Sequence, residues 1–209
     1  MAAQLALHNT SVWPVLSGRH RNRGGVKKWS VTRQDMIRTL REGRYCSTMF
    51  DYYALPDDWP GRTNAVSKLW NERASTVEEQ IHADMTTAMG GSFNPKFFVP
   101  YVQLHEFEAL AFADVSVLAS VLSPIGRLPS ERLRQYFADI LTQAGHPEAI
   151  NDRYETCPSR RITNVVPAYK KRAQGPIVTS RIGIDVMRAQ CTHFGEWLIR
   201  LEQLGSEAG

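Results

Sequence analysis

The sequence predicts an α/β protein in which a mostly parallel sheet is flanked by helices and followed by a helical C-terminal part. Two stretches rich in β-favouring apolar residues, 45–50 and 97–102, run directly into acidic residues, as buried strands do at the carboxyl edge of a sheet. Apolar residues recur at helical spacing between and after them. The composition, 43% hydrophobic and 22% charged over 209 residues, is globular. We expect one domain over 1–209, with the α/β part at 1–114 and the mainly helical part at 115–209.

Local signals set the elements expected in the α/β part. Ser30 offers an N-cap for a helix that Gly43 ends, and a glycine pair followed by a proline connects a long helical stretch to the second strand. The expected elements, in order, are a helix remnant at 2–8, a short strand at 11–16, a helix at 31–42, a strand at 45–50, a helical stretch at 62–89 with a break near Ser75, and a strand at 97–102.

The C-terminal part shows repeated helical periodicity. Gly145 and Pro147 end one clearly amphipathic segment. A run of acids beside bases, 151–161, has the character of a helix start. The expected helices lie at 114–121, 130–144, onward from about 158, and at 196–204.

Acidic residues follow both predicted strands. Asp51 is the first polar residue after one strand, and His105, Glu106 and Glu108 follow the other. Carboxylates at one sheet edge can share a divalent metal, so we take Asp51 and Glu106 as catalytic residues and metal ligands, with Glu108 as a further ligand. If a helix begins near Leu104, Glu106 and Glu108 lie about 200° apart around its axis, so only one easily faces the site, and the apolar stripe favours Glu106. His105 is a candidate general base or ligand, the alternative being a locally hydrogen-bonded histidine.

Basic residues gather in two places although the net charge is only +4. Two such clusters flanking an acidic centre favour a phosphate-bearing partner, nucleic acid above all, while the alternative is a pair of solvated faces. The candidate nucleic-acid-binding residues are Arg21, Arg23, Lys27 and Lys28 in the first cluster and Arg160 and Arg161 in the second.

Cysteines and hydropathy argue for the cytoplasm. The three cysteines are far apart and form no CxxC pair, which indicates neither a disulfide framework nor a zinc site. The N-terminus lacks the basic and apolar regions of a signal peptide. The longest apolar stretch, 109–122, is too short to span a bilayer of about 30 Å, so no membrane association is expected.

Four strings of the sequence carry a resemblance to a known family. The chain resembles the DUF4276 family of bacterial and archaeal proteins, which is grouped with the Toprim-like domains, over nearly its whole length. The strings are TMFDYYALPDDWPG, PYVQLHEFEALAF, INDRYETCPSRRI and CTHFGEWLIRLEQL.

The resemblance implies metal-dependent phosphoryl transfer with Mg²⁺ or Mn²⁺ as cofactor. Asp51 matches the first aspartate of the Toprim signature, but Tyr53 stands where the second would be. Similar proteins open with a strand and a glutamate-rich turn that this sequence does not show, so we expect an N-terminal truncation or a late-assigned start codon. The INDRYETCPSRRI string is expected to lie over the site, with Ser159 or Arg160 reaching a phosphate.

Two hypotheses of different classes follow, with a third that is more general. The first is a Toprim-like, Mg²⁺-dependent nuclease that works with an ATPase encoded nearby in a mobile-element or phage-defence operon. The second is a non-catalytic binding or regulatory subunit that keeps the fold. The third is a structural protein whose acids are solvated turns. A sheet without its first strand would also be prone to association, so an oligomer is compatible with each.

Overall fold

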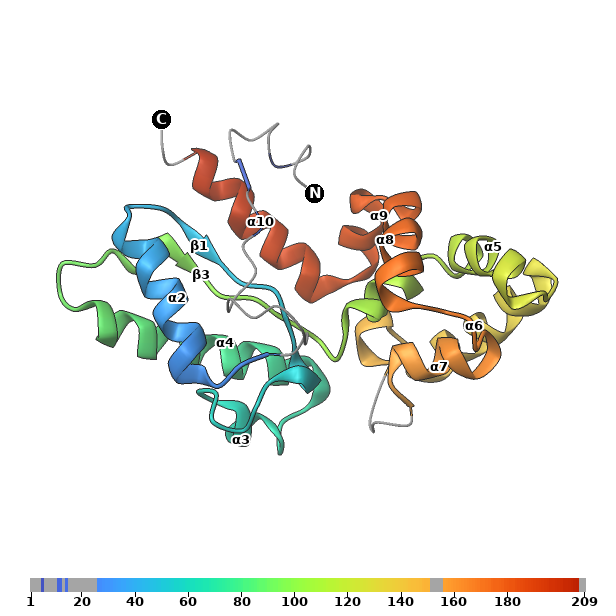
Figure 1. The fold of residues 1–209 in the computed structure, drawn as a ribbon, viewed down its shortest axis with the longest axis horizontal. Coiled ribbons are helices and arrows are strands. Elements are labelled where there is room, and N and C mark those ends of the chain that lie inside the picture. The colour runs from blue at the N-terminus through green and yellow to red at the C-terminus, as the bar shows by residue number, and fades with distance from the viewer. Residues whose placement is uncertain (1–4, 6–10, 13, 15–25, 151–155, 207–209) are drawn as a thin grey trace.

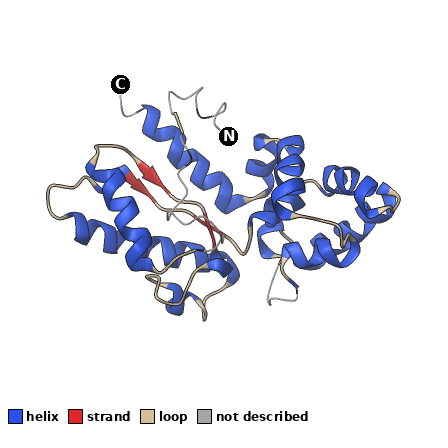
Figure 2. Ribbon diagram, in the orientation of Figure 1, coloured by secondary structure: helices blue, strands red, loops and turns tan. Residues whose placement is uncertain are grey.

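The computed structural model of the protein describes residues 5, 11–12, 14, 26–150 and 156–206. Most of these residues are helical, and strands are few and short (Figure 2). The elements, in chain order, are α2 (Trp29–Arg41), β1 (Cys46–Ser47), β2 (Phe50–Asp51), η1 (Tyr52–Ala54), α3 (Arg62–Ala65), α4 (Trp70–Met89), η2 (Pro95–Phe97), β3 (Phe98–Val99), β4 (Val102–Gln103), η3 (Phe107–Ala113), α5 (Val115–Gly126), α6 (Ser130–Ala144), η4 (Pro147–Ala149), α7 (Pro158–Val165), α8 (Lys171–Ile182), α9 (Ile184–Gln190) and α10 (Thr192–Ser206).

The described strands form two parallel pairs, β1 with β3 and β2 with β4. The register is the same in both pairs, so they are two parts of one ladder with an interruption between them. At the interruption the Thr48 hydroxyl donates to the Tyr101 carbonyl at 2.9 Å and accepts from the Tyr101 N–H at 2.8 Å. Pro100 has no N–H to continue the ladder. The predicted parallel arrangement is therefore confirmed, but the sheet is much smaller than expected.

Helices cover both faces of the strands. Phe98 and Val102 point into the core formed with α2 and α4, while Val99 and Tyr101 point to the opposite side. There the Tyr101 ring stacks on Trp197 of α10, with ring centroids 4.4 Å apart, and the Trp197 indole N–H donates to the Ser47 hydroxyl at 2.9 Å. The C-terminal helix thus returns to lie beside β1 and β3 (Figure 1).

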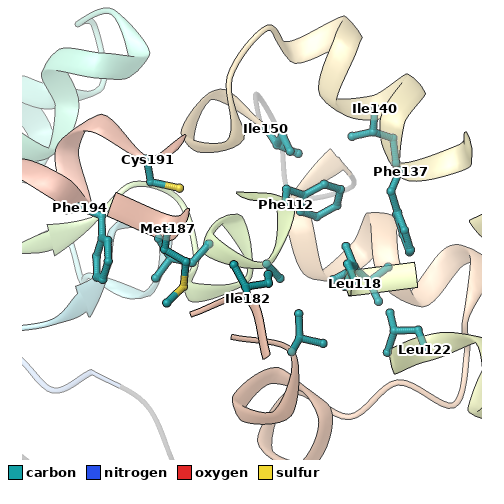
Figure 3. Close-up of a cluster of buried hydrophobic side chains, with 14 of the residues drawn as sticks. Phe112, Leu118, Leu122, Phe137, Ile140, Ile150, Ile182, Met187, Cys191 and Phe194 are labelled. Atoms are coloured by element: carbon teal, nitrogen blue, oxygen red, sulfur yellow. The ribbon is translucent and has the colours of Figure 1, made fainter. Parts of the chain in front are cut away.

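Helices α5 to α9 make up the other half of the molecule (Figure 1). Their buried side chains meet in one cluster that includes Phe112 and Phe137, which pack edge to face at 5.7 Å (Figure 3). Asp114 caps α5 by accepting two backbone N–H groups, and Gly145, at φ 74°, ends α6 as predicted. No single helix in the described ranges is long and apolar enough to cross a membrane, and η3 with α5 passes that test only as a pair bent by 108°.

Several helix boundaries differ from the expectation. Helix α5 continues to Gly126 rather than ending at 121, and α10 begins at Thr192 rather than at 196. Two further differences have identifiable causes. Helix α2 begins before Ser30, because the Asp58 carboxylate, from a distant loop, accepts the Trp29 N–H at 3.0 Å. The long helical stretch breaks at 66–69 rather than near Ser75, since Glu72 accepts the Leu69 N–H at 3.3 Å and so starts α4 there. The elements expected at 2–8 and 11–16 lie largely outside the described residues.

Candidate acidic site at the strand ends

Asp51 is the last residue of β2 and pairs with Gln103 at the end of β4. Because the two strands are parallel, the chain leaves both of them at the same edge, and the acids that follow β4 come close to Asp51. The segment after β4 contacts Asp51 directly, since Asp51 Oδ1 accepts the Phe107 N–H at 2.9 Å. The ladder therefore joins the two acidic segments that the sequence separates.

The turn after β4 decides how Glu106 and Glu108 are oriented. His105 is in the left-handed region with φ 64°, and Glu106 is extended, with φ −146° and ψ 156°. Helix η3 begins only at Phe107 and is a 3₁₀ helix. The expectation that an α-helix begins near Leu104 and lets one glutamate face the site is therefore wrong, because the extended residue delays the helix and both carboxylates reach the same cation.

That cation is Lys171, the first residue of α8. Its Nζ lies 3.0 Å from Glu106 Oε1 and 3.0 Å from Glu108 Oε2. Glu106 Oε2 also accepts the Ser159 N–H at 3.0 Å, and Glu108 Oε1 accepts the Tyr169 hydroxyl at 3.3 Å. The two glutamates are largely buried, with side chains 15% and 3% exposed, while Lys171 is 46% exposed. Asp51, Glu106, Glu108 and Lys171 are called the acidic cluster below.

The two glutamates respond differently to the same lysine. Burial acts to raise the pKa of Glu106, but the hydrogen bonds from Ser159 and Lys171 outweigh burial and the pKa is lowered. Burial raises the pKa of Glu108, and the opposing charge of Lys171 does not compensate for it. Burial also opposes the charge on Lys171, yet the two carboxylates raise its pKa. Glu106 and Lys171 are thus an ion pair at neutral pH, with Glu108 the less readily ionised partner.

Asp51 is the most perturbed carboxyl of the acidic cluster. Burial raises its pKa to about 6, Lys171 lowers it, and Glu108 and Glu106 raise it further. The Asp51 carboxyl therefore keeps its proton to a higher pH than an ordinary aspartate does. Carboxyl groups whose pKa is shifted by burial and by nearby charges are common at functional sites, and they also occur in structural ion pairs.

His105 lies buried beside the acidic cluster, between β4 and Glu106. Its ring stacks on Tyr53, with ring centroids 5.3 Å apart and an interplanar angle of 19°, and its carbonyl accepts the Tyr53 N–H at 3.4 Å. The ring contact and the burial give His105 a packing role. Its role as a base or ligand stays a prediction.

Comparison with known protein families identifies the family of this chain. The sequence profile described as a domain of unknown function, DUF4276, matches residues 5–202. The chain belongs to the DUF4276 family. No curated protein and no solved structure matches the chain significantly. The family resemblance read from the four strings is confirmed, and one of them, INDRYETCPSRRI, contributes the Ser159 N–H that binds Glu106.

The acidic cluster consists of three carboxylates and one lysine. Three carboxylates offer the oxygen ligands that Mg²⁺ and Mn²⁺ prefer. Among the described residues, however, no group of three or more His, Cys, Asp or Glu is arranged to hold a metal ion. The Lys171 ammonium lies between Glu106 and Glu108 instead. A divalent ion bound by both glutamates would take over contacts that Lys171 makes here.

The predicted nucleic-acid-binding residues fall into separate places. Arg21 and Arg23 lie outside the described residues. Lys27 and Lys28 directly precede α2, whereas Arg160 and Arg161 lie on α7, and the two helices belong to different halves of the DUF4276 molecule (Figure 1). Arg160 is exposed and directly follows Ser159, whose N–H donates to Glu106.

Sequence reasoning did not identify Lys171 and Tyr169 as members of the site. Lys171 belongs to the second basic cluster, in a run at 170–172 that the charge pattern assigns either to phosphate contact or to a solvated face. The available signal was position, since Lys171 opens a helix in a segment rich in basic residues. Nothing local indicates that this helix start faces two glutamates more than 60 residues earlier in the chain.

Proposed function

We propose that this DUF4276 chain is a divalent-metal-dependent phosphodiesterase that acts on nucleic acid through a Toprim-like set of carboxylates. The observation that carries the proposal is that Lys171 bridges Glu106 and Glu108 directly after β4, where the Asp51 carboxylate at the end of the parallel strand β2 accepts the Phe107 N–H. Partly buried carboxylates that lie this close repel one another. Such an arrangement gives little to folding and suits a site that needs charge.

Each residue of the acidic cluster has a defined part in this proposal. Asp51 and Glu106 would hold Mg²⁺ or Mn²⁺, with Glu108 as a third ligand. The Phe107 and Ser159 N–H groups orient the first two carboxylates. Such an ion, when bound, would supply positive charge for the phosphoryl oxygens and would lower the pKa of a water molecule. Lys171 supplies a second positive charge beside the phosphate.

The basic residues and the partner belong to the same proposal. Arg160 and Arg161 on α7 contact the phosphate backbone next to the acidic cluster, and Lys27 and Lys28 extend the contact elsewhere. An ATPase partner and a role in phage defence are inferred from the family resemblance alone.

One observation favours a second candidate function, a non-catalytic binding or regulatory subunit. Lys171 satisfies Glu106 and Glu108 at 3.0 Å each, as a permanent structural ion pair would. In that case the acidic cluster only fixes α8 and α7 against the strand ends.

Nucleolytic cleavage distinguishes the two candidates. We expect the purified chain to cut end-labelled single-stranded or duplex oligonucleotides with Mn²⁺ or Mg²⁺ and not with EDTA. Asp51→Asn and Glu106→Gln are expected to lower the rate by more than about 100-fold, because even outer-shell changes at metal sites cost 10–100-fold. Glu131→Gln, which alters an exposed carboxylate on α6, is the matched control and keeps full activity. A wild-type chain that binds the oligonucleotides and cuts none of them would support the second candidate.

A further inference from the structure

The structure holds an exposed aromatic side chain at the edge of the acidic cluster. Tyr53 lies two residues after Asp51, in η1, and 37% of its surface is exposed. It stands at the position where the Toprim signature has a second aspartate, so it cannot serve as a metal ligand in the expected way. Its place beside the site needs another explanation.

Tyr53 is held on a rigid base. Its ring stacks on the buried His105, and its N–H donates to the His105 carbonyl. The neighbouring Tyr52 is buried, meets the Tyr53 ring edge to face at 5.4 Å, and accepts a hydrogen bond from Arg62 at 2.9 Å. Little conformational freedom is lost when a flat ligand binds to an aromatic ring that is already fixed in this way.

The charges nearby indicate what that ligand is. The half-exposed Lys171 contacts Glu106 and Glu108, and its charge lowers the pKa of Asp51. The exposed Arg160 directly follows Ser159, whose N–H binds Glu106. A fixed aromatic ring beside the proposed phosphate-binding site matches the way single-stranded nucleic acids are held, by stacked bases and a contacted backbone. Paired bases in a duplex are not available for such stacking.

We propose that Tyr53 is a stacking platform for an unpaired base, and that the substrate class of this site is single-stranded nucleic acid or an unpaired segment of a duplex. This inference rests on the proposed function and adds the substrate class to it. It also accounts for an aromatic residue where the signature would have an acid.

Fluorescence anisotropy with a labelled single strand and a duplex of the same sequence tests the inference, in Ca²⁺ so that an oxygen-seeking ion is present. Tyr53→Ala is expected to weaken single-strand binding by about 5- to 150-fold, the range of one lost base–aromatic stack. Tyr53→Phe and Tyr53→Trp retain binding. The matched control is Tyr45→Ala, because Tyr45 is 42% exposed and pairs with Phe97 but precedes β1, at the opposite strand ends.

Each other outcome overturns the inference. Single-strand binding that is unchanged in Tyr53→Ala would show that the ring contacts no base, as would an equal loss of duplex binding. A wild-type chain that binds neither oligonucleotide would leave Tyr53 to a protein partner. Direct titration with metal ions separates this failure from a failure of the proposed function, because ion binding by Asp51 and Glu106 does not depend on Tyr53.

Discussion

Asp51→Asn is expected to stabilise the folded protein by about 2 kcal/mol at pH 8 in metal-free buffer. Burial raises the pKa of Asp51 from 3.8 to about 6, so ionising this carboxyl costs more in the folded than in the unfolded chain. Asparagine keeps the oxygen that accepts the Phe107 N–H and carries no charge. A side chain whose substitution stabilises the folded protein is typically one that is retained for function.

The pH dependence of that gain follows from the raised pKa. Between about pH 4 and pH 6 the folded state binds more protons at Asp51 than the unfolded state does, so the wild-type protein loses stability over this window as the pH rises. Above about pH 6 the wild-type protein has lost this stability in full, and its free energy of unfolding no longer changes through Asp51. Urea unfolding followed by tryptophan fluorescence should therefore show the two proteins diverging from about pH 4 to pH 6. Asp57→Asn, at an exposed position in the next loop, is the control. An Asp51→Asn protein less stable than wild type at pH 8 would refute the assigned burial cost.

Lys171→Met is expected to have the opposite effect. It removes the cation that bridges Glu106 and Glu108, which are 15% and 3% exposed. Removing one partner of a fully buried ion pair costs about 3–5 kcal/mol, and since Lys171 is nearly half exposed we expect about 2 kcal/mol at pH 8. The loss should shrink only as the pH falls below the ordinary glutamate pKa of 4.5, because the pKa of Glu106 is lowered and a glutamate needs no counter-charge once it is protonated.

Thermal unfolding with and without Mn²⁺ measures this effect and its cause. If metal and lysine use the same carboxylate oxygens, Mn²⁺ should stabilise Lys171→Met more than wild type, because no ammonium competes with it. Lys170→Met, at the exposed neighbouring position, should change neither value. Equal stabilisation of both proteins by Mn²⁺ would show that the ion binds elsewhere.

The sequence was sufficient to identify the features that depend on short-range chemistry. Asp51 and Glu106 were expected at one edge because acids directly follow apolar strand residues, and the ladder does bring the segment that follows β4 into contact with Asp51. Asp114 and Gly145 mark helix ends through their own side-chain and backbone preferences.

Features that depend on distant residues were not predictable in this way. Helix α2 starts early because Asp58 caps it from another loop. The sheet is interrupted because Thr48 binds the Tyr101 backbone. The acidic cluster is completed by Lys171, whose partners lie far earlier in the chain. In each case a tertiary contact decides between local conformations that the sequence alone leaves equally acceptable.

Isothermal titration calorimetry with Mn²⁺ and Mg²⁺ tests the central claim most directly, namely that Asp51 and Glu106 hold a divalent ion. Wild type and Glu131→Gln should bind one ion per chain, and Asp51→Ala and Glu106→Ala should bind none, with folding of each variant checked by circular dichroism. Ion binding that survives in both alanine variants, or its absence from the wild-type chain, would contradict the account and leave the acidic cluster as a structural ion pair.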